Sequence, residues 1–159
     1  MGRLEGDSAA LQPIAETFRR CGFDTVVSVD VKKQIWSKLF LNASASALTA
    51  ILQVRLGYVA ENEHAWSLAQ RLIREAVTVA NAEVGGFDPD QVIADVKAVL
   101  VRARDGLTSI YADIREGRQT EVDTISGSVV RTAKRLGIAV PSHELVVALV
   151  HALEGRERL

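Results

Sequence analysis

Three polar side chains stand four residues apart on one apolar stretch of the sequence, Trp36 to Leu52. If this stretch is a helix, Lys38, Asn42 and Ser46 lie on one slowly drifting stripe, and a helix so apolar all round is normally buried. A buried ammonium group without a partner is very costly, so Lys38 is expected to be paired, neutral or at a cavity wall. The alternative is that Lys38 reaches solvent from the helix rim while the other two bond inside the fold.

A second set of candidates comes from the later part of the sequence. If Thr120 is the N-cap of a helix, Glu121 lies in the first turn, where the helix dipole favours an ionised carboxylate. That anion would suit a cationic lysine or a substrate hydroxyl, although acids are also common in first turns for helix stability alone. Ser109 and Asp113 lie four apart on the helix predicted to lead into Glu121, and each alone would be an ordinary surface residue.

Other polar residues give weaker signals. Glu75 borders the apolar face of its predicted helix, four residues after Arg71, and a solvated ion pair is the simplest interpretation. His64, His143 and His151 are too scattered to suggest a metal site, so each is expected at the surface or at the core edge. No glycine-rich dinucleotide motif or P-loop occurs, so no cradle for a nucleotide is visible in the sequence.

The composition excludes several classes of protein. The 159 residues suffice for one domain with a sizeable core, and 48% apolar with 25% charged residues is ordinary for a soluble protein. A net charge of −1 with interspersed signs predicts neither nucleic-acid nor membrane-surface binding. The single cysteine, Cys21, fits a reducing compartment. No signal peptide and no unbroken membrane-length apolar run is seen, so we expect a cytoplasmic location.

Helical periodicity dominates the elements that must position the candidates. The one convincing strand signal is Phe23 to Val29, and Gln53 to Ala60 is expected to be a connection that turns at Gly57. Helix start and stop signals predict helices over about residues 8–20, 31–52, 61–84, 89–105, 108–116, 121–136 and 141–153, with a fraying charged end at 154–159. The Asp88-Pro89 start includes a capping box completed by Gln91. The sequence therefore predicts an all-helical domain with a small αβ lead-in.

Together these pieces resemble the C-terminal domain of the ketopantoate reductase (2-dehydropantoate 2-reductase) family. The resemblance covers nearly the whole chain, and its second block is long and ordered enough to be specific. The matching blocks are Asp30…Trp36-x-Lys38-Leu39-x-x-Asn42, Ser109-x-x-x-Asp113-Ile114-x-x-Gly117-Arg118-x-Thr120-Glu121-Val122-Asp123-x-Ile125-x-Gly127, and Gly137-Ile138-x-Val140-Pro141.

The resemblance implies an all-α fold of the 6-phosphogluconate dehydrogenase C-terminal type. Residues 1–29 would be the tail of a Rossmann domain and its linker, and residues 30–159 the helical domain. Lys38 would be the general acid that protonates the ketone oxygen, which suits the negative charge that develops there. Glu121 would hold the substrate hydroxyl and help orient that lysine.

The other candidates receive lesser roles from the same resemblance. Asn42 and Ser109 match substrate-contacting positions, while Glu75 and Asp113 match acids with a supporting role. Ser46 departs from the family, in which many members have a second asparagine eight residues after the lysine. A serine there still bonds but leaves more room, so another 2-oxo acid is an alternative substrate.

Three hypotheses follow. The first is the substrate-binding and catalytic domain of an NADPH-dependent 2-dehydropantoate 2-reductase in pantothenate synthesis, working with the N-terminal Rossmann domain of a longer parent. The second is a reductase of another 2-oxo or opine-like substrate. The third is a non-catalytic helical module for dimerisation or binding. NADPH is expected in the parent and no cofactor in this chain alone, which should then be inactive; a homodimer is left open.

Overall fold

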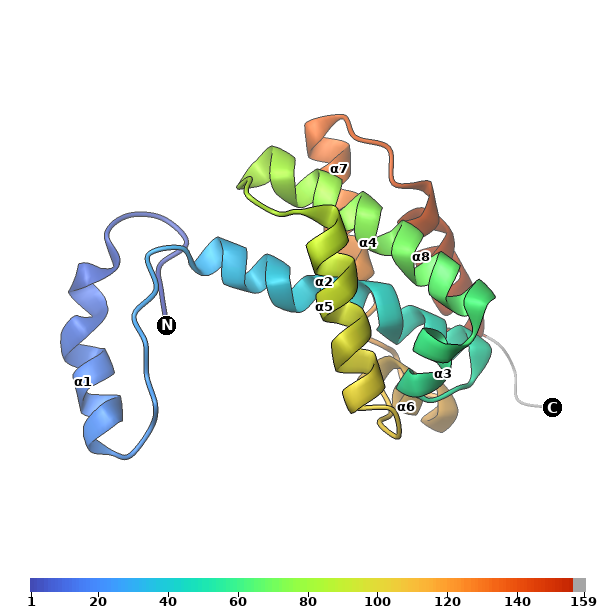
Figure 1. Cartoon of the computed structure of the whole chain (residues 1–159), viewed down its shortest axis with the longest axis horizontal. Helices are drawn as coiled ribbons and strands as arrows, with labels where there is room; N and C mark the ends of the chain where they lie inside the picture. The colour runs from blue at the N-terminus through green and yellow to red at the C-terminus, as the bar shows by residue number, and fades with distance from the viewer. Residues whose placement is uncertain (156–159) are drawn as a thin grey trace. The chain divides into compact units, whose positions relative to one another are not determined.

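The computed structural model describes residues 1–155 and forms two compact units, Met1–Ser37 and Lys38–Leu159 (Figure 1). All regular structure in the described part is helical, so the prediction of an all-α fold is confirmed. The elements are a short 3₁₀ helix η1 (Ser8–Leu11) and the α-helices α1 (Gln12–Arg20), α2 (Val31–Leu52), α3 (Leu56–Glu61), α4 (Glu63–Glu83), α5 (Pro89–Arg102), α6 (Ser109–Glu116), α7 (Ser126–Leu136) and α8 (Pro141–Glu154).

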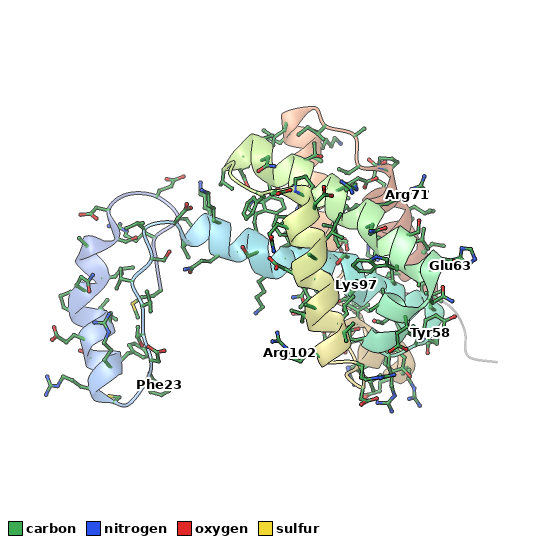
Figure 2. The ribbon with its side chains drawn as sticks, in the orientation of Figure 1. Phe23, Tyr58, Glu63, Arg71, Lys97 and Arg102 are labelled. Carbon is green, nitrogen blue, oxygen red and sulfur yellow. The ribbon has the colours of Figure 1, made fainter. Side chains whose placement is uncertain are left out.

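The first unit pairs η1 and α1 with an extended segment, and the strand predicted from Phe23 to Val29 is wrong. A strand requires a ladder of hydrogen bonds with a neighbour. Here the segment forms no such ladder: the Met1 ammonium donates to the Val26 carbonyl (2.6 Å), the Met1 carbonyl accepts from the Ser28 amide (2.7 Å), and Nε of Arg19 donates to the Thr25 carbonyl (2.7 Å). Its large apolar side chains are mostly exposed, as Figure 2 shows for Phe23.

The second unit has a continuous core around α4, which contacts α3, α5, α7 and α8. One face of α4, including Leu72 and Ile73, is almost completely buried, as the 3.6-residue spacing predicts. The later part of α2, residues 43–50, is buried on every side. Its many alanines and serines allow neighbouring chain to approach closely.

Among residues 1–155, α2 alone has the length and apolar character of a membrane-spanning helix, and it lies near the N-terminus. More than half of its apolar window, 56%, is buried inside the fold. A core helix of a globular unit passes the same test, so length and composition do not distinguish the two.

Most predicted helix ends are confirmed. Asn62 caps α4 by accepting from the His64 and Ala65 amides, and Asp88 caps α5 ahead of Pro89. Gly117 and Gly137 end α6 and α7 with left-handed backbone (φ 69° and 70°), which glycine adopts without strain.

Two local predictions are wrong. Gly57 lies inside α3 and not in a turn; a Cβ there would lie 3.1 Å from the backbone of Arg104, so the glycine allows a close approach. Gln91 does not complete the capping box, because its side-chain amide donates to Asp95 (2.8 Å).

Candidate functional site

A cavity of about 230 Å³ in the second unit gathers four of the seven predicted site residues. Asn42, Ser46, Ser109 and Glu121 all line it, although they come from three separate parts of the chain. Its other lining residues are mostly apolar: Leu41, Ala45, Leu56, Leu107, Thr108 and Ile125. The cavity is therefore small and lined mostly by apolar side chains with a few polar groups, which is the usual composition of a small-molecule site.

Helix α2 supplies Asn42 and Ser46, and their four-residue spacing places both on the cavity wall. Lys38 lies one turn earlier on the same helix, outside the residues that line the cavity. Its side chain is exposed and makes no hydrogen bond or ion pair within residues 1–155, which agrees with the alternative that Lys38 reaches solvent from the helix rim. The ammonium lies at the exposed end of the stripe that continues into the cavity.

Glu121 reaches the cavity from a turn and not from a helix, because α7 begins only at Ser126. The Glu121 carbonyl accepts from the amides of Thr124 and Ile125, both at 3.0 Å, which makes Thr120–Thr124 a separate turn ahead of α7. The prediction that Thr120 is the N-cap of a helix is wrong, and the Thr120 amide donates to the carboxylate of Glu154 (2.7 Å).

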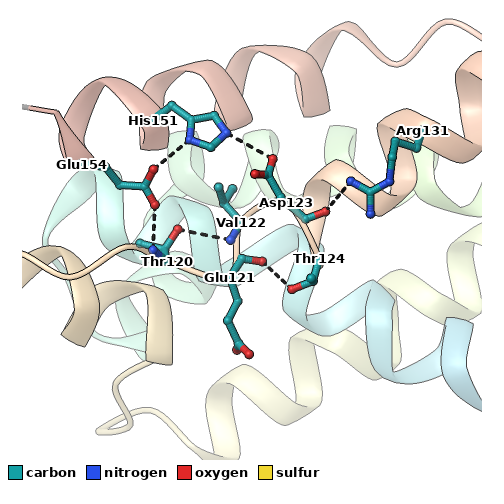
Figure 3. Close-up of polar contacts among 8 residues, drawn as sticks. All are labelled: Thr120, Glu121, Val122, Asp123, Thr124, Arg131, His151 and Glu154. Carbon is teal, nitrogen blue, oxygen red and sulfur yellow. Dashed lines mark hydrogen bonds and ion pairs between the residues drawn. The ribbon is translucent and has the colours of Figure 1, made fainter.

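The Glu121 carboxylate has no hydrogen-bond or ion-pair partner among residues 1–155. Figure 3 shows its side chain pointing away from the polar contacts that surround the turn. The adjacent Val122 is fully buried and fixes the opposite side of the turn in the core. An unpaired carboxylate at a cavity wall is available to accept from a ligand hydroxyl or ammonium group.

Behind the Glu121 turn lies a cluster of polar contacts that sequence reasoning missed. His151 bonds Glu154 through Nδ1 (2.7 Å) and Asp123 through Nε2 (3.1 Å), and Glu154 also accepts from the Thr120 amide (Figure 3). The bond to Glu154 raises the pKa of His151 against a desolvation cost, and Asp123 adds to the rise. Burial raises the pKa of Glu154, but hydrogen bonds from Thr120 and His151 outweigh this and leave that pKa below its usual value. The predicted fraying at 154 is wrong; residues 156–159 lie outside the described part.

Ser109 is positioned by the start of α6. Thr108 is the N-cap of that helix and accepts from the Tyr111 amide (3.2 Å). The Thr108 hydroxyl also bonds the Thr49 hydroxyl of α2 (2.8 Å), which ties the start of α6 to the helix that carries Asn42. Thr108 was missed because a lone threonine before a predicted helix signals a cap and not a cavity wall.

Glu75 and Asp113 lie outside the cavity and have structural roles. The two carboxylate oxygens of Glu75 accept from the Ser142 and His143 amides (3.0 and 3.1 Å), so α4 caps α8, and no Glu75 ion pair with Arg71 forms within residues 1–155. Asp113 accepts from Nε and Nη2 of Arg118 (2.9 and 2.8 Å) and so braces the end of α6.

The histidines divide between surface and core. His143 is fully buried, contrary to prediction, and its Nε2 lies 3.0 Å from the Leu72 carbonyl. Burial lowers the pKa of His143, although the Leu72 bond and the charge of Glu75 oppose the shift. Within the described residues, no group of three or more histidine, cysteine, aspartate or glutamate side chains is placed to hold a metal ion.

Residues 30–154 match the family described as ketopantoate reductase PanE/ApbA C terminal. The chain belongs to this family. A 2-dehydropantoate 2-reductase of Pyrococcus horikoshii is 29% identical over 150 residues, which are 94% of this chain and 50% of the relative. This ketopantoate reductase C-terminal domain thus spans about half the length of the curated relative.

Solved structures of relatives share the fold. A D-mandelate dehydrogenase with NADH and anilino(oxo)acetate superposes with a TM-score of 0.86 at 27% identity, covering 96% of this chain and 64% of that one. A PanE/ApbA family ketopantoate reductase from Ralstonia eutropha JMP134 gives a TM-score of 0.82 at 29% identity, covering 89% and 47%. Members of the ketopantoate reductase family are oxidoreductases, and the D-mandelate dehydrogenase structure contains NADH.

Proposed function

We propose that this chain is the substrate-binding and catalytic domain of an NADPH-dependent 2-dehydropantoate 2-reductase. The observation that supports this most directly is the cavity, where Asn42, Ser46, Ser109 and Glu121 converge from separate segments. The family supplies the reaction class and the cavity supplies a place for a small polar substrate. Residues 1–29 are the tail of the nucleotide-binding domain in this proposal, and the family match begins at residue 30.

The chemistry assigns each residue a task. Reduction of a ketone develops negative charge on its oxygen, and the Lys38 ammonium stabilises that charge and supplies the proton. The Asn42 amide and the hydroxyls of Ser46 and Ser109 orient the carboxylate and carbonyl groups by hydrogen bonds. Glu121 accepts from the substrate hydroxyl and orients Lys38. The residues Glu75 and Asp113 support the fold around the site and do not touch the substrate.

The nicotinamide nucleotide, when bound, supplies the hydride. The residues present do not fit the nucleotide itself, because the sequence lacks a glycine-rich turn and the extended segment before α2 forms no sheet among the described residues. We therefore assign the nucleotide to an N-terminal Rossmann domain that acts with this chain. Calorimetric titration of residues 1–159 with NADPH should show no binding, and micromolar binding would contradict the assignment.

A second substrate is favoured by the cavity wall. Ser46 is shorter than asparagine, and Leu41, Leu56, Leu107 and Ile125 offer an apolar surface to a bulky side chain. The similarity to a D-mandelate dehydrogenase that binds anilino(oxo)acetate supports an aryl 2-oxo acid. This alternative keeps the same residues in the same tasks and changes only the side chain of the substrate.

The deciding experiment is an assay of this chain joined to a nucleotide-binding domain, in its natural polypeptide or as a fusion to that of a relative. Oxidation of NADPH and NADH is followed with ketopantoate, phenylglyoxylate and pyruvate. Reduction of ketopantoate with the highest kcat/KM supports the first proposal, and preference for phenylglyoxylate supports the second. No turnover with any 2-oxo acid would contradict both and favour a binding module. A cytoplasmic location stays a prediction. Sedimentation equilibrium tests whether the protein forms a homodimer.

A further inference from the structure

The last turn of α8 holds the turn that carries Glu121, although neither His151 nor Glu154 lines the cavity. The Thr120–Thr124 turn has polar anchors on one side and the cavity on the other (Figure 3). On the anchored side, the Glu154 carboxylate accepts from the Thr120 amide at 2.7 Å across 34 positions of sequence. One bond therefore joins the end of the last helix to the residue directly before Glu121.

His151 ties the same helix to the turn at a second point. Both of its ring nitrogens face carboxylate oxygens, those of Glu154 and Asp123. Carboxylates only accept, so both nitrogens must donate and the ring makes both bonds as the imidazolium cation. The raised pKa of His151 agrees with this form. Arg131 of α7 adds a third contact through the Asp123 carbonyl (2.9 Å).

These contacts fix a geometry that Glu121 cannot fix for itself. Its side chain has no partner among residues 1–155, so its direction depends on the backbone of the turn. Buried Val122 anchors the turn in the core, and its carbonyl accepts from the Gly127 amide (2.9 Å), which ties the turn to the start of α7. The contacts at Thr120 and Asp123 lie on either side of Glu121 and Val122 and add anchors from α8.

We propose that Glu154 and His151 are positioning residues for Glu121, bracing the Thr120–Thr124 turn so that the carboxylate of Glu121 stays in the cavity. The catalytic consequence rests on the function proposed above, whereas the bracing does not. Neither residue touches the substrate, and their effect on the reaction passes through Glu121.

The test uses three variants. Glu154→Ala removes the acceptor for both Thr120 and His151, and Glu154→Gln keeps an oxygen that can accept from the Thr120 amide. Glu83→Ala is the matched control: it breaks an ion pair of similar length, Glu83–Arg135 at 2.6 Å, whose residues do not line the cavity.

The first measurement is on residues 1–159 without substrate. In Glu154→Ala the amides of residues 120–125 should exchange with deuterium about tenfold faster, the worth of one hydrogen bond, and proton–proton contacts between the Glu121 side chain and the other cavity-lining side chains should weaken. Glu154→Gln should bring the exchange rates and the Glu121 contacts most of the way back to those of the wild type. Glu83→Ala should change neither the exchange rates nor the contacts. Unchanged exchange and contacts in Glu154→Ala would overturn the proposal whatever the protein's function is.

The second measurement is kinetic, in the same protein joined to its nucleotide-binding domain. Glu154→Ala should lower kcat/KM for the preferred 2-oxo acid about tenfold, with rescue by Glu154→Gln, while thermal unfolding shifts no more than in Glu83→Ala. A loosened turn with unchanged kinetic constants would overturn the positioning role. If the wild type reduces no 2-oxo acid, the proposed function fails, and the exchange and Glu121 contacts still decide whether the turn is braced.

Discussion

The two units of this chain differ in how far they bury their large apolar side chains. The first, Met1–Ser37, leaves most of its large apolar side chains exposed, with Val29 at 94% and Phe23 at 61% of full accessibility. In the second, helices α4 to α8 bury one face each, and Leu72 is exposed by only 1%. One unit has a core of its own and the other has very little.

The difference shows where chain composition alone is misleading. The sequence of the first unit is as apolar as that of a folded domain, yet burial needs a second layer to pack against. The extended segment at residues 23–29 has the residues of a buried strand but no partner strand among the described residues, and it bonds to Met1 and to Phe18 and Arg19 of α1. The second unit has such a layer within itself, because α3, α5, α7 and α8 all pack on α4.

The largest expected effect tests whether the chemistry belongs to the second unit. In the chain joined to a nucleotide-binding domain, Lys38→Met should lower the turnover of the proposed reductase by about two to four orders of magnitude, the usual worth of a general acid. The matched control is Lys33→Met, a lysine five residues earlier on the same helix but in the first unit. Steady-state kinetics with NADPH and the preferred 2-oxo acid measure both. A Lys38→Met enzyme with more than half of the wild-type turnover would remove Lys38 from the mechanism.

A comparison of core substitutions tests the packing difference directly. Leu72→Ala in α4 should destabilise residues 1–159 by about 2–5 kcal/mol, because it removes a fully buried side chain and leaves a cavity. Val29→Ala should change the unfolding free energy by less than about 0.5 kcal/mol, because Val29 is already in solvent. Urea unfolding followed by circular dichroism measures both. If both substitutions lowered the unfolding free energy equally, Val29 would have to be packed in a core, contrary to its exposure in the structure.

The pH dependence of stability separates a buried histidine from an exposed one in the second unit. His143 has a lowered pKa, so the unfolded chain takes up its proton near pH 6.5 before the folded chain does, and stability should fall as the pH drops below 6.5. His151 has a raised pKa, so its contribution is present below pH 6.5 and is lost as the pH rises through its folded pKa.

Urea unfolding between pH 5 and pH 8 measures the two effects. One proton gives a slope of at most about 1.4 kcal/mol per pH unit. His143→Gln should flatten the acid side of the profile and His151→Gln the alkaline side. If stability still falls equally steeply below pH 6.5 in His143→Gln, that loss of stability comes from protonation of carboxylates and not from His143.

The smallest expected effect concerns the cavity wall. Ser46→Asn should shift preference toward ketopantoate over phenylglyoxylate by a few-fold to tenfold, because one hydrogen bond in a closed site is worth about 0.5–1.5 kcal/mol. Ser37→Asn, on the exposed face of the same helix in the first unit, serves as the control. The ratio of the two kcat/KM values is the measurement. An unchanged ratio in Ser46→Asn would show that this position does not select the substrate.

Much of the helical unit could be predicted because its signals are local. Apolar periodicity predicted α4, and Asp88-Pro89 and the glycines after α6 and α7 predicted ends that the structure confirms. Gly57 shows the limit of such signals: its reason is the nearby backbone of Arg104, 47 positions away, which no local pattern reveals. The strand at residues 23–29 failed for the same reason, since pairing partners are not local.

In the candidate site, too, local features could be predicted from the sequence and contacts between distant residues could not. The spacing of Asn42 and Ser46 placed both on one wall, as a helix requires, but spacing did not show that Lys38 is exposed at the end of that stripe. The sequence around Glu121 predicted a helix start, but Glu121 lies in a turn and reaches the cavity from there. The Thr120 amide donates to Glu154, which no local pattern indicates. A carboxylate near the end of the sequence gave no sign that it bonds a residue 34 positions earlier.

Helix α8 is held at both ends by carboxylates, since Glu75 of α4 caps its start and its own Glu154 bonds the Thr120 amide at its close. No residue of α8 lines the cavity. A shortened version of this protein that stopped at residue 150 would keep every cavity-lining side chain and still lose the brace behind one of them. For anyone choosing where to cut, graft or fuse this domain, the boundary of the binding site therefore extends to the last helical turn, well beyond any atom that a ligand could touch.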